Sequence, residues 1–212
     1  MTLPENTCIA GQKTVADWRA MKGRLVDCAD PTIWKAAFED FFKARINSRY
    51  FEPIRAIEKM GQKVGAGFAI VTLHCSLIEF LAATLAGKTY RYSRNEKPPL
   101  GPFEYSDSGN MFITFLENCE PFSAMFSAQG MARDFYSDVR CGLLHEARTK
   151  GLWRIRVCES AALAIDATEK IIYRNKMQAA FDQFVMWYRG KLLSDVEFQK
   201  AFIRKFDGLC SE

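Results

Sequence analysis

Apolar side chains recur along most of this chain three and four residues apart, the spacing with which an α-helix buries one face. The first clear helix is predicted to begin at Asp30-Pro31, because aspartate caps helix N-termini and proline suits the first helical position. Apolar residues keep the helical spacing from there to Ile57. Pro53 lies inside this stretch and must kink or divide it, because proline has no backbone N–H to donate.

The segment from Ala66 to Ala86 is apolar on nearly all sides, and the following Gly87 is a typical helix end. A helix that is apolar all round belongs in the centre of a fold. Residues 88–109 contain many charges and prolines and are predicted to form a loop. Short and long helices are then predicted over 108–115 and 131–147. The inner side of the longer one is expected to consist of Phe135, Val139, Leu143 and Leu144.

The hydrophobic spacing changes after Gly151. Residues 153–157 alternate between apolar side chains and arginine, which is the two-residue period of a strand, and residues 163–165 and 171–173 are predicted partner strands. Two capping-box patterns follow and predict the starts of the last two helices, at Asn175–Gln178 and Ser194–Glu197. The first of these helices is expected to bury Phe181, Phe184 and Tyr188, and the second to end near Gly208.

These elements predict a mainly α fold, a helical bundle with extra N-terminal helices and a small β-hairpin or strand excursion after the helix over 131–147. The chain has 212 residues, which fits one domain, and 17 phenylalanines and 4 tryptophans supply ample core. We expect a single domain over 1–212. It would consist of an N-terminal helical elaboration (1–63), a bundle core (64–193) and a C-terminal helix (194–212).

Charge and cysteine usage narrow the class of function only slightly. The chain has 29 basic and 25 acidic side chains, and the net charge of +4 permits a polyanionic partner without requiring one. Its seven cysteines include no C-x-x-C pair, so neither a zinc site nor a redox motif is predicted. We expect reduced, mostly buried thiols and no metal or cofactor.

Export and membrane insertion are not predicted either. Residues 1–12 lack the basic start and apolar run of a signal peptide. The longest apolar stretch, residues 68–86, contains His74 and Glu79, and two ionisable groups disfavour a membrane span but can be satisfied inside a protein. We therefore expect a cytoplasmic protein with no membrane partner.

The chain has only two histidines for acid–base chemistry. His74 has apolar neighbours in the predicted central helix, and its simplest interpretation is a core histidine with a hydrogen-bond partner. Glu79 is interpreted either as a buried carboxylate that orients another side chain or as a surface residue. His145 lies near the end of the helix over 131–147, and Arg140 precedes it by five residues.

An arginine and a histidine together suit phosphoryl chemistry on RNA. An imidazole that titrates near neutral pH can take or give a proton at the 2′-hydroxyl or at the leaving 5′-oxygen. A guanidinium can hold the non-bridging phosphate oxygens. The spacing alone is common by chance, and a surface Arg140 paired with Asp138 or Glu146 beside an exposed His145 is the plainer alternative. Gly142 between them permits close approach of another backbone.

The run from Arg140 through Cys141 to His145 matches the R-x4-6-H pattern of the HEPN superfamily, the all-helical domains of prokaryotic toxins and antiviral systems. The chain resembles this family over roughly residues 64–190, and residues 139–153 resemble a bacterial subgroup of uncharacterised HEPN-like proteins. The resemblance implies a HEPN-like bundle in which the helix containing Glu79 is the long central helix.

The same resemblance implies a homodimeric, metal-independent endoribonuclease. Arg140 would bind phosphate, His145 would act as general acid or base, and Cys141 and Glu79 would support the motif. Active members often place a polar residue after the arginine, and the sequence departs from this pattern at Cys141. RNA is then an expected partner, together with an antitoxin or a defence-system protein. The alternatives are a non-catalytic HEPN-like module that binds RNA, nucleotide or protein, and a purely structural helical dimer.

Two groups of basic residues offer weaker RNA contacts. Arg148, Lys150 and Arg154 follow the motif, with Arg156 beyond them, and they line an RNA path or form a solvated face broken by Glu146 and Glu159. Tyrosines and arginines alternate over residues 90–94, either as stacking faces for a single strand or as a packed loop.

Overall fold

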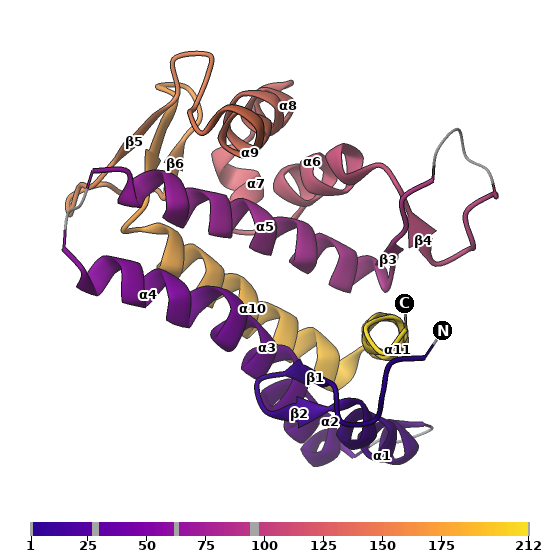
Figure 1. The fold of residues 1–212 in the computed structure, drawn as a ribbon. Helices are drawn as coiled ribbons and strands as arrows, with labels where there is room; N and C mark the ends of the chain where they lie inside the picture. Colours follow the sequence, from indigo (N-terminus) through magenta and orange to yellow (C-terminus); the bar gives the residue numbers. More distant parts are fainter. Residues whose placement is uncertain (1, 27–29, 62–63, 94–97, 212) are drawn as a thin grey trace. The chain divides into compact units, whose positions relative to one another are not determined.

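The computed structural model describes residues 2–26, 30–61, 64–93 and 98–211. Most of these residues are helical, which confirms the mainly α fold class, and short strands form small sheets (Figure 1). The chain forms two compact units. Unit 1 comprises Met1–Pro53, Ala83–Ser106 and Trp187–Glu212, and unit 2 comprises Ile54–Ala82 and Asp107–Met186. The predicted single-domain organisation stays a prediction.

Unit 1 contains the N-terminal helices and the C-terminal helix. Its elements are β1 (Cys8–Ala10), β2 (Lys13–Thr14), α1 (Val15–Leu25), α2 (Pro31–Ala37), the π-helical η1 (Phe38–Lys43), α3 (Ala44–Ile46), the π-helical η2 (Asn47–Phe51), β3 (Thr89–Tyr90), β4 (Glu104–Tyr105) and α11 (Val196–Gly208). Three helices contribute residues to both units: α4 (Glu52–Lys59), α5 (Ala66–Ala86) and α10 (Met177–Ser194).

The core of unit 1 forms around Trp18 on α1, which is 1% exposed. Its indole Nε1 donates to Asp207 on α11 over 2.9 Å, and Lys22 pairs with the other oxygen of that carboxylate at 2.7 Å. The indole ring also packs against three buried rings, Phe41, Phe202 and Phe206. Aromatic packing of this kind, closed by a buried hydrogen bond, attaches the C-terminal helix to the N-terminal one.

The chain comes very close to α11 at Gly87. The glycine has a φ of +61°, and a Cβ atom there would lie 2.7 Å from the Cα atom of Ala201. Lys205, only 6% exposed, donates from Nζ to the carbonyl of Lys88 over 3.0 Å. The predicted helix end at Gly87 is confirmed, because only glycine fits both the left-handed backbone and the close contact.

Helix α1 precedes the predicted first helix and was not predicted. Thr14 caps it in a capping box, in which Asp17 donates its N–H to the threonine hydroxyl and accepts the Thr14 N–H. The start of α2 is as predicted, since Asp30 accepts from the Thr32 N–H at 2.8 Å. Pro53 does not end a helix. It is the second residue of α4, directly after η2, so its missing N–H falls where the helix type changes.

Unit 2 contains the predicted motif helix and the strand excursion. Its own elements are α6 (Ser108–Asn118), α7 (Phe122–Met125), α8 (Met131–Asp134), the π-helical η4 (Phe135–Arg140), α9 (Cys141–Glu146), β5 (Arg154–Arg156), β6 (Ile165–Asp166) and β7 (Ile171–Tyr173). The core is a series of aromatic contacts at centroid distances of 5.0–6.2 Å: Phe112 with Phe135, Phe115 with Phe184, Phe122 with Phe181, and Phe135 with Trp153.

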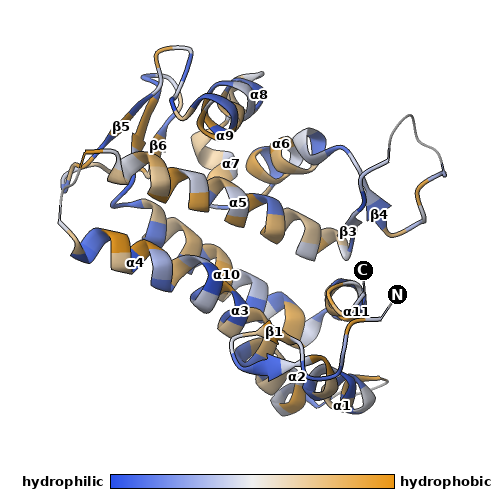
Figure 2. Cartoon of the chain, viewed as in Figure 1, coloured by the Kyte–Doolittle hydropathy of each residue, from blue (hydrophilic) through white to orange (hydrophobic). Residues whose placement is uncertain are grey.

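The α5 helix has the predicted bounds, Ala66–Ala86, and is apolar over much of its surface (Figure 2). Among the described helices it is the one long and apolar enough to cross a membrane, with a mean hydropathy of 1.8, and 61% of that stretch is buried inside the protein. A central core helix has the same composition. Location in the cytoplasm and absence of a membrane partner stay predictions.

The strand excursion is present as predicted. β7 lies between the other two strands, parallel to β5 and antiparallel to β6, with Ile172 opposite both Ile155 and Ile165. The loop predicted over 88–109 is interrupted by a short parallel pair, β3 with β4. Such a two-residue pair has too little sequence to carry a strand signal.

The predicted cap at Ser194 is wrong, because the neighbouring Asp195 caps α11. Asp107 caps α6, which begins at Ser108. Asn175 instead accepts the N–H of Cys158 at 3.2 Å and donates to its carbonyl, which fixes the chain between β5 and α10.

Candidate functional site

Arg140 is the last residue of η4 in a continuous helix over 131–146. Its Nη2 atom donates to Oε2 of Glu79 on α5 at 3.1 Å, and the two side chains are 20% and 19% exposed. Arg140 is therefore not a surface residue paired with Asp138 or Glu146. Of the two interpretations of Glu79, the partly buried carboxylate that orients another side chain is the one in the structure.

Two neighbours of Arg140 were not predicted. The guanidinium carbon of Arg140 lies 5.4 Å from the ring centroid of Tyr136, one helical turn earlier, and the Tyr136 hydroxyl hydrogen bonds with Ser108 of α6 at 3.2 Å. The four-residue spacing of Tyr136 and Arg140 is a signal that the sequence contained. The contact to Ser108 depends on the packing of α6, which no local pattern reveals.

Burial and charge act in opposite directions on this cluster. Burial alone lowers the pKa of Arg140, but its charge interactions with Tyr136 and Glu79 outweigh burial and raise the pKa above its usual value. Burial raises the pKa of Tyr136, and it raises the pKa of the nearby Cys75 thiol to about 12. Cys141 influences the pKa of Arg140 and Tyr136, so its thiol belongs to the same cluster. Arg140 is thus charged at ordinary pH and is held by its ion pair with Glu79.

His145 lies on α9, one residue before the helix ends, and is exposed. The helix terminates because Ala147 adopts a left-handed conformation with a φ of +53°. Within the described ranges the side chain of His145 forms no hydrogen bond or ion pair with any residue, including Arg140. One chain therefore presents the two motif residues separately, the arginine held against α5 and the histidine open to solvent.

The chain after the motif folds back onto the motif helix. A Cβ atom at Gly142 would lie 2.6 Å from the carbonyl oxygen of Arg148, and one at Gly151 would overlap the carboxylate of Asp138. The N–H of Lys150 donates to the Asp138 carbonyl at 2.8 Å. The close backbone approach predicted at Gly142 is therefore present, and it is made by the chain's own loop.

A hollow of about 120 Å³ opens beside the Arg140–Glu79 pair, lined also by Thr72, Ser76 and Leu144. This is roughly the volume that four water molecules occupy in the liquid, and it is enough for one phosphate group. Leu144 is 56% exposed, so its predicted place on the inner side is wrong. On an α-helix Leu144 lies about 100° from Leu143 and about 180° from Phe135, so helical spacing itself places Leu144 outside the buried stripe of Phe135, Val139 and Leu143.

The predicted RNA path separates into two parts. Arg148 and Lys150 both pair with Glu146, at 3.0 and 2.8 Å, and form an exposed ionic cluster. Arg154 instead lies on β5, where its Nη2 atom donates to the carbonyl of Glu169 at 3.0 Å. The structure places Arg154 in a different hollow, described below, and away from the Glu146 cluster.

His74 is a core residue, as predicted, with 1% exposure and its ring 5.3 Å from that of Phe181. The predicted hydrogen-bond partner is not found among the described residues, because neither ring nitrogen has one. Burial lowers the pKa of His74 to about 3, so the imidazole is neutral at ordinary pH. It is not placed to serve Arg140 and His145.

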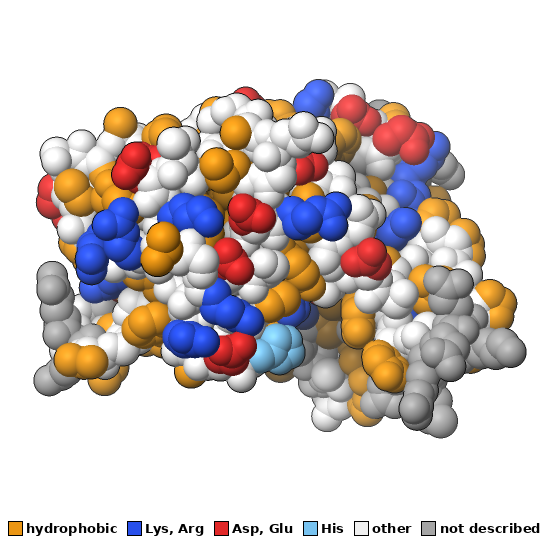
Figure 3. Space-filling model, turned by 90° about the horizontal axis from the view of Figure 1, so that it is seen from above, with side chains coloured by type: hydrophobic (Ala, Val, Ile, Leu, Met, Phe, Trp, Pro, Cys, Tyr) orange, Lys and Arg blue, Asp and Glu red, His pale blue; other side chains and the backbone are white. Residues whose placement is uncertain are grey.

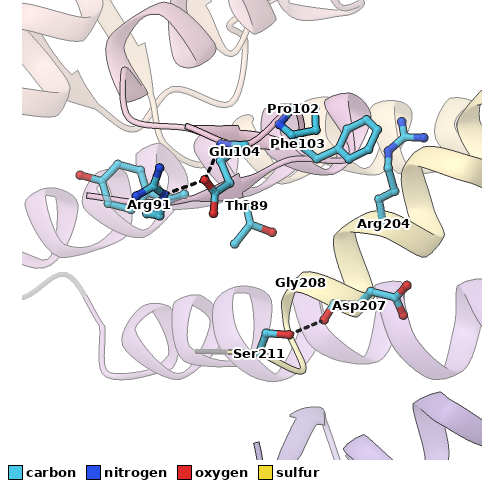
Figure 4. A pocket seen from close by; sticks show the side chains of 11 residues that line it. Thr89, Arg91, Pro102, Phe103, Glu104, Arg204, Asp207, Gly208 and Ser211 are labelled. Atoms are coloured by element: carbon cyan, nitrogen blue, oxygen red, sulfur yellow. Dashed lines mark hydrogen bonds and ion pairs between the residues drawn. The ribbon is translucent and has the colours of Figure 1, made fainter. Parts of the chain in front are cut away.

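Of the tyrosine and arginine stretch over residues 90–94, Tyr90 and Arg91 line a hollow of about 490 Å³ in unit 1 (Figure 4). Arg91 donates from Nε to Glu104 at 2.6 Å, and Tyr90 packs edge-on against Tyr105. Arg204 lies over the ring of Phe103, 4.5 Å from its centroid. These contacts favour a packed loop over a single-strand binder, and Arg94 lies outside the described residues.

No group of three or more potential metal ligands is found in the part of the chain that the structure describes. Six cysteines are free thiols, of which Cys75 and Cys210 are buried and Cys8 is exposed, so the expectation of mostly buried thiols is wrong. Cys28 lies outside the described residues. Comparison with known protein families, curated protein sequences and solved structures gives no match for this chain.

Proposed function

We propose that this protein is a metal-independent endoribonuclease of the HEPN type, acting as a homodimer in a toxin–antitoxin or antiphage system. The observation that carries the proposal is the placement of the motif residues: a partly buried, oriented Arg140 at a phosphate-sized hollow and an exposed, unpartnered His145 on the same helix. The cytoplasm is the proposed location.

In the proposed reaction the 2′-hydroxyl oxygen attacks the adjacent phosphorus, and the bond to the 5′-oxygen breaks. His145 removes the 2′-hydroxyl proton or protonates the leaving 5′-oxygen. Arg140 stabilises the charge that gathers on the non-bridging oxygens. The products are a 2′,3′-cyclic phosphate and a 5′-hydroxyl, so atoms and protons balance without another reactant.

A second copy of the chain is part of the proposal because Arg140 and His145 of one chain are apart. A dimer that apposes two motif helices would bring His145 of one copy toward Arg140 of the other. The exposed Leu144, between the two residues, offers apolar surface for such an interface. Glu79 would then keep the guanidinium in place while its remaining N–H groups face the substrate.

The alternative function is a non-catalytic module that binds RNA, nucleotide or a protein through the same surface. The specific observation in its favour is the Arg140–Glu79 ion pair, which already neutralises much of the arginine's charge. The thiol of Cys141, a weak hydrogen-bond donor, adds to this alternative.

The deciding experiment incubates the purified protein with single-stranded RNA in EDTA and compares it with His145→Ala. Loss of a general acid or base costs about 100-fold or more in rate, so cleavage is expected to fall by at least that factor. His145 is exposed and unpartnered, so the variant should keep its melting temperature. End-group analysis should find 2′,3′-cyclic phosphate.

Arg140→Lys complements this test, because it keeps a charge near Glu79 but loses the forked geometry for phosphate. It should bind RNA and cleave slowly. Undiminished cleavage in both variants, or cleavage that requires added metal, contradicts the mechanism. A folded dimer that binds RNA without cutting it supports the alternative module.

A further inference from the structure

Unit 2 has a hollow of about 680 Å³ between the start of α5 and the sheet of β5 and β7. We call it the arginine groove and define it by Phe68, Trp153, Arg154, Arg156 and Arg174. Its volume lies within the range of ligand sites in proteins. Figure 3 shows Lys and Arg side chains gathered on the side of the molecule where β5 and β6 lie in Figure 1.

The sheet register brings the three arginines together. Arg154 and Arg156 are two residues apart on β5 and so extend from the same face of the strand. Arg174 directly follows β7, and its N–H donates to the carbonyl of Arg156 at 3.1 Å. Gly67 lets α5 approach this edge, because a Cβ there would lie 3.1 Å from Cγ2 of Ile155 on β5.

The charges of the arginine groove are not balanced. None of its lining residues is acidic, and none of the three arginines forms an ion pair with a described residue. The hydrogen bond from Arg154 to the Glu169 carbonyl leaves its charge in place. Three cations that share one hollow repel each other, and an anion with several charged oxygens removes that cost.

Trp153 and Phe68 favour a ligand that has a hydrogen-bond acceptor and an aromatic ring as well as negative charge. The indole N–H of Trp153 has no acceptor among the described residues, although the residue is only 3% exposed. Phe68 has 41% of its surface exposed at the edge of the same hollow. A buried donor without a partner is unfavourable, and an exposed phenylalanine offers a stacking face.

We infer that the arginine groove binds a segment of single-stranded RNA, with phosphates on the arginines and a base on Phe68. This inference rests on the proposed function, because it names where the substrate strand lies. Guanidinium groups bind phosphate through paired hydrogen bonds, and bases stack on aromatic side chains. The RNA path thus consists of Arg154, Arg156 and Arg174, and the Arg148–Lys150 cluster is not part of it.

The test measures fluorescence anisotropy of a labelled 2′-O-methyl oligouridylate 12-mer, which lacks the attacking hydroxyl, with the intact chain in EDTA. Arg154→Ala/Arg156→Ala should weaken binding about tenfold or more, because two charged hydrogen-bond donors are lost. It should also make the salt dependence of log K shallower by about 1.4, since each phosphate contact to a single strand contributes about 0.7.

Arg55→Ala/Arg133→Ala is the matched control, because it removes two exposed arginines of the same unit from outside the groove. Its affinity should remain within twofold of the unmodified chain. Phe68→Leu keeps the apolar surface but removes the ring, and should weaken binding about fivefold.

Equal losses in the groove variant and the control, absence of RNA binding, or equal displacement of RNA by polyglutamate each overturn the inference. Its failure is distinguishable from failure of the proposed function. If His145→Ala abolishes cleavage while the groove variant binds and cuts normally, only the groove is wrong. If the groove binds as expected but the chain never cuts RNA, only the nuclease is wrong.

Discussion

Two tryptophans, one in each unit, are both almost fully buried but differ in what their indole N–H finds. Trp18 of unit 1 donates to Asp207 at 2.9 Å, whereas Trp153 of unit 2 has no acceptor in the described ranges. Two buried ionisable side chains, Lys205 and His74, show the same contrast. Lys205 of unit 1 donates to a carbonyl, while both nitrogens of His74 in unit 2 lack partners among those residues.

The hollows of the two units differ in the same way. In unit 1, Arg91 is paired with Glu104, and Asp207 is engaged by Trp18 and Lys22. In unit 2, three arginines line one hollow with no acidic residue. Cations without acidic neighbours favour the binding of an anion. The difference in charge balance therefore directs the search for function to unit 2, although both hollows contain arginine.

The largest effect on this comparison is expected from Gly87→Ala. The substitution forces alanine into a left-handed backbone and places its Cβ atom 2.7 Å from the backbone of Ala201. Strain and overpacking together should lower the free energy of unfolding by about 2–4 kcal/mol. Displacing α11 would also separate Lys205 from its carbonyl, so a buried ammonium group in unit 1 would lose its acceptor.

Urea denaturation of this variant measures the change. Gly190→Ala is its control, since a Cβ there meets nothing within 4 Å. Equal stability of the two variants would contradict the close packing at Gly87.

The second largest effect is expected on the pH dependence of the free energy of unfolding, through His74. Its folded pKa of about 3 lies below the ordinary value of 6.5, so at pH above about 6.5 neither state binds the proton. Below that pH the unfolded chain binds it and the folded chain does not. The stability contributed by the neutral imidazole is therefore lost between pH 6.5 and 3, at up to about 1.4 kcal/mol per pH unit.

His74→Leu should remove this dependence and exceed the stability of the unmodified chain by about 2–3 kcal/mol at pH 4.5, relative to their difference at pH 7. Denaturant titrations at the two pH values provide the measurement. His145→Ala removes the exposed histidine and should leave the pH dependence due to His74 intact. A constant difference between His74→Leu and the unmodified chain at both pH values would show that His74 acquires its proton when folded.

The smallest effect comes from making one substitution in both units. Trp18→Phe and Trp153→Phe each remove an indole N–H, but only Trp18 loses a hydrogen bond, and it leaves Asp207 with one donor fewer. Trp18→Phe should therefore cost about 1 kcal/mol more in unfolding free energy than Trp153→Phe. Thermal denaturation of both proteins tests this, and equal losses would mean that Trp153 has a partner in solution.

Local patterns predicted the long elements well because their signals are local. Periodic apolar residues and a closing glycine sufficed for α5, and alternation with arginine sufficed for β5. One missed feature, α1, does have local signals: the Thr14–Asp17 capping box and the helical spacing of Val15, Trp18, Met21 and Leu25. Other missed features depend on tertiary structure, since the partner of Asn175 lies 17 residues away.

The candidate site likewise has a part that local sequence signals indicate and a part that depends on tertiary contacts. The motif residues Arg140 and His145 could be selected by residue type, and the link between Arg140 and Glu79 spans 61 residues of sequence. The arginine groove could not be predicted as a unit, since Arg174 joins Arg154 and Arg156 only through the parallel pairing of β5 with β7.

The π-helical segment η4 has a consequence for the way this motif evolves. A π-helical turn contains about one residue more than an α-helical turn, and deleting a residue restores the ordinary helix. Such a deletion between Phe135 and Arg140 would leave the residues before it facing nearly the same way relative to Arg140 and His145, because the longer π-helical turn and the shorter α-helical turn complete the same rotation. The segment can therefore gain or lose one residue while the direction in which the motif faces is kept. Relatives could differ in length here with every motif residue and its orientation intact, and scanning by substitution would never sample that route.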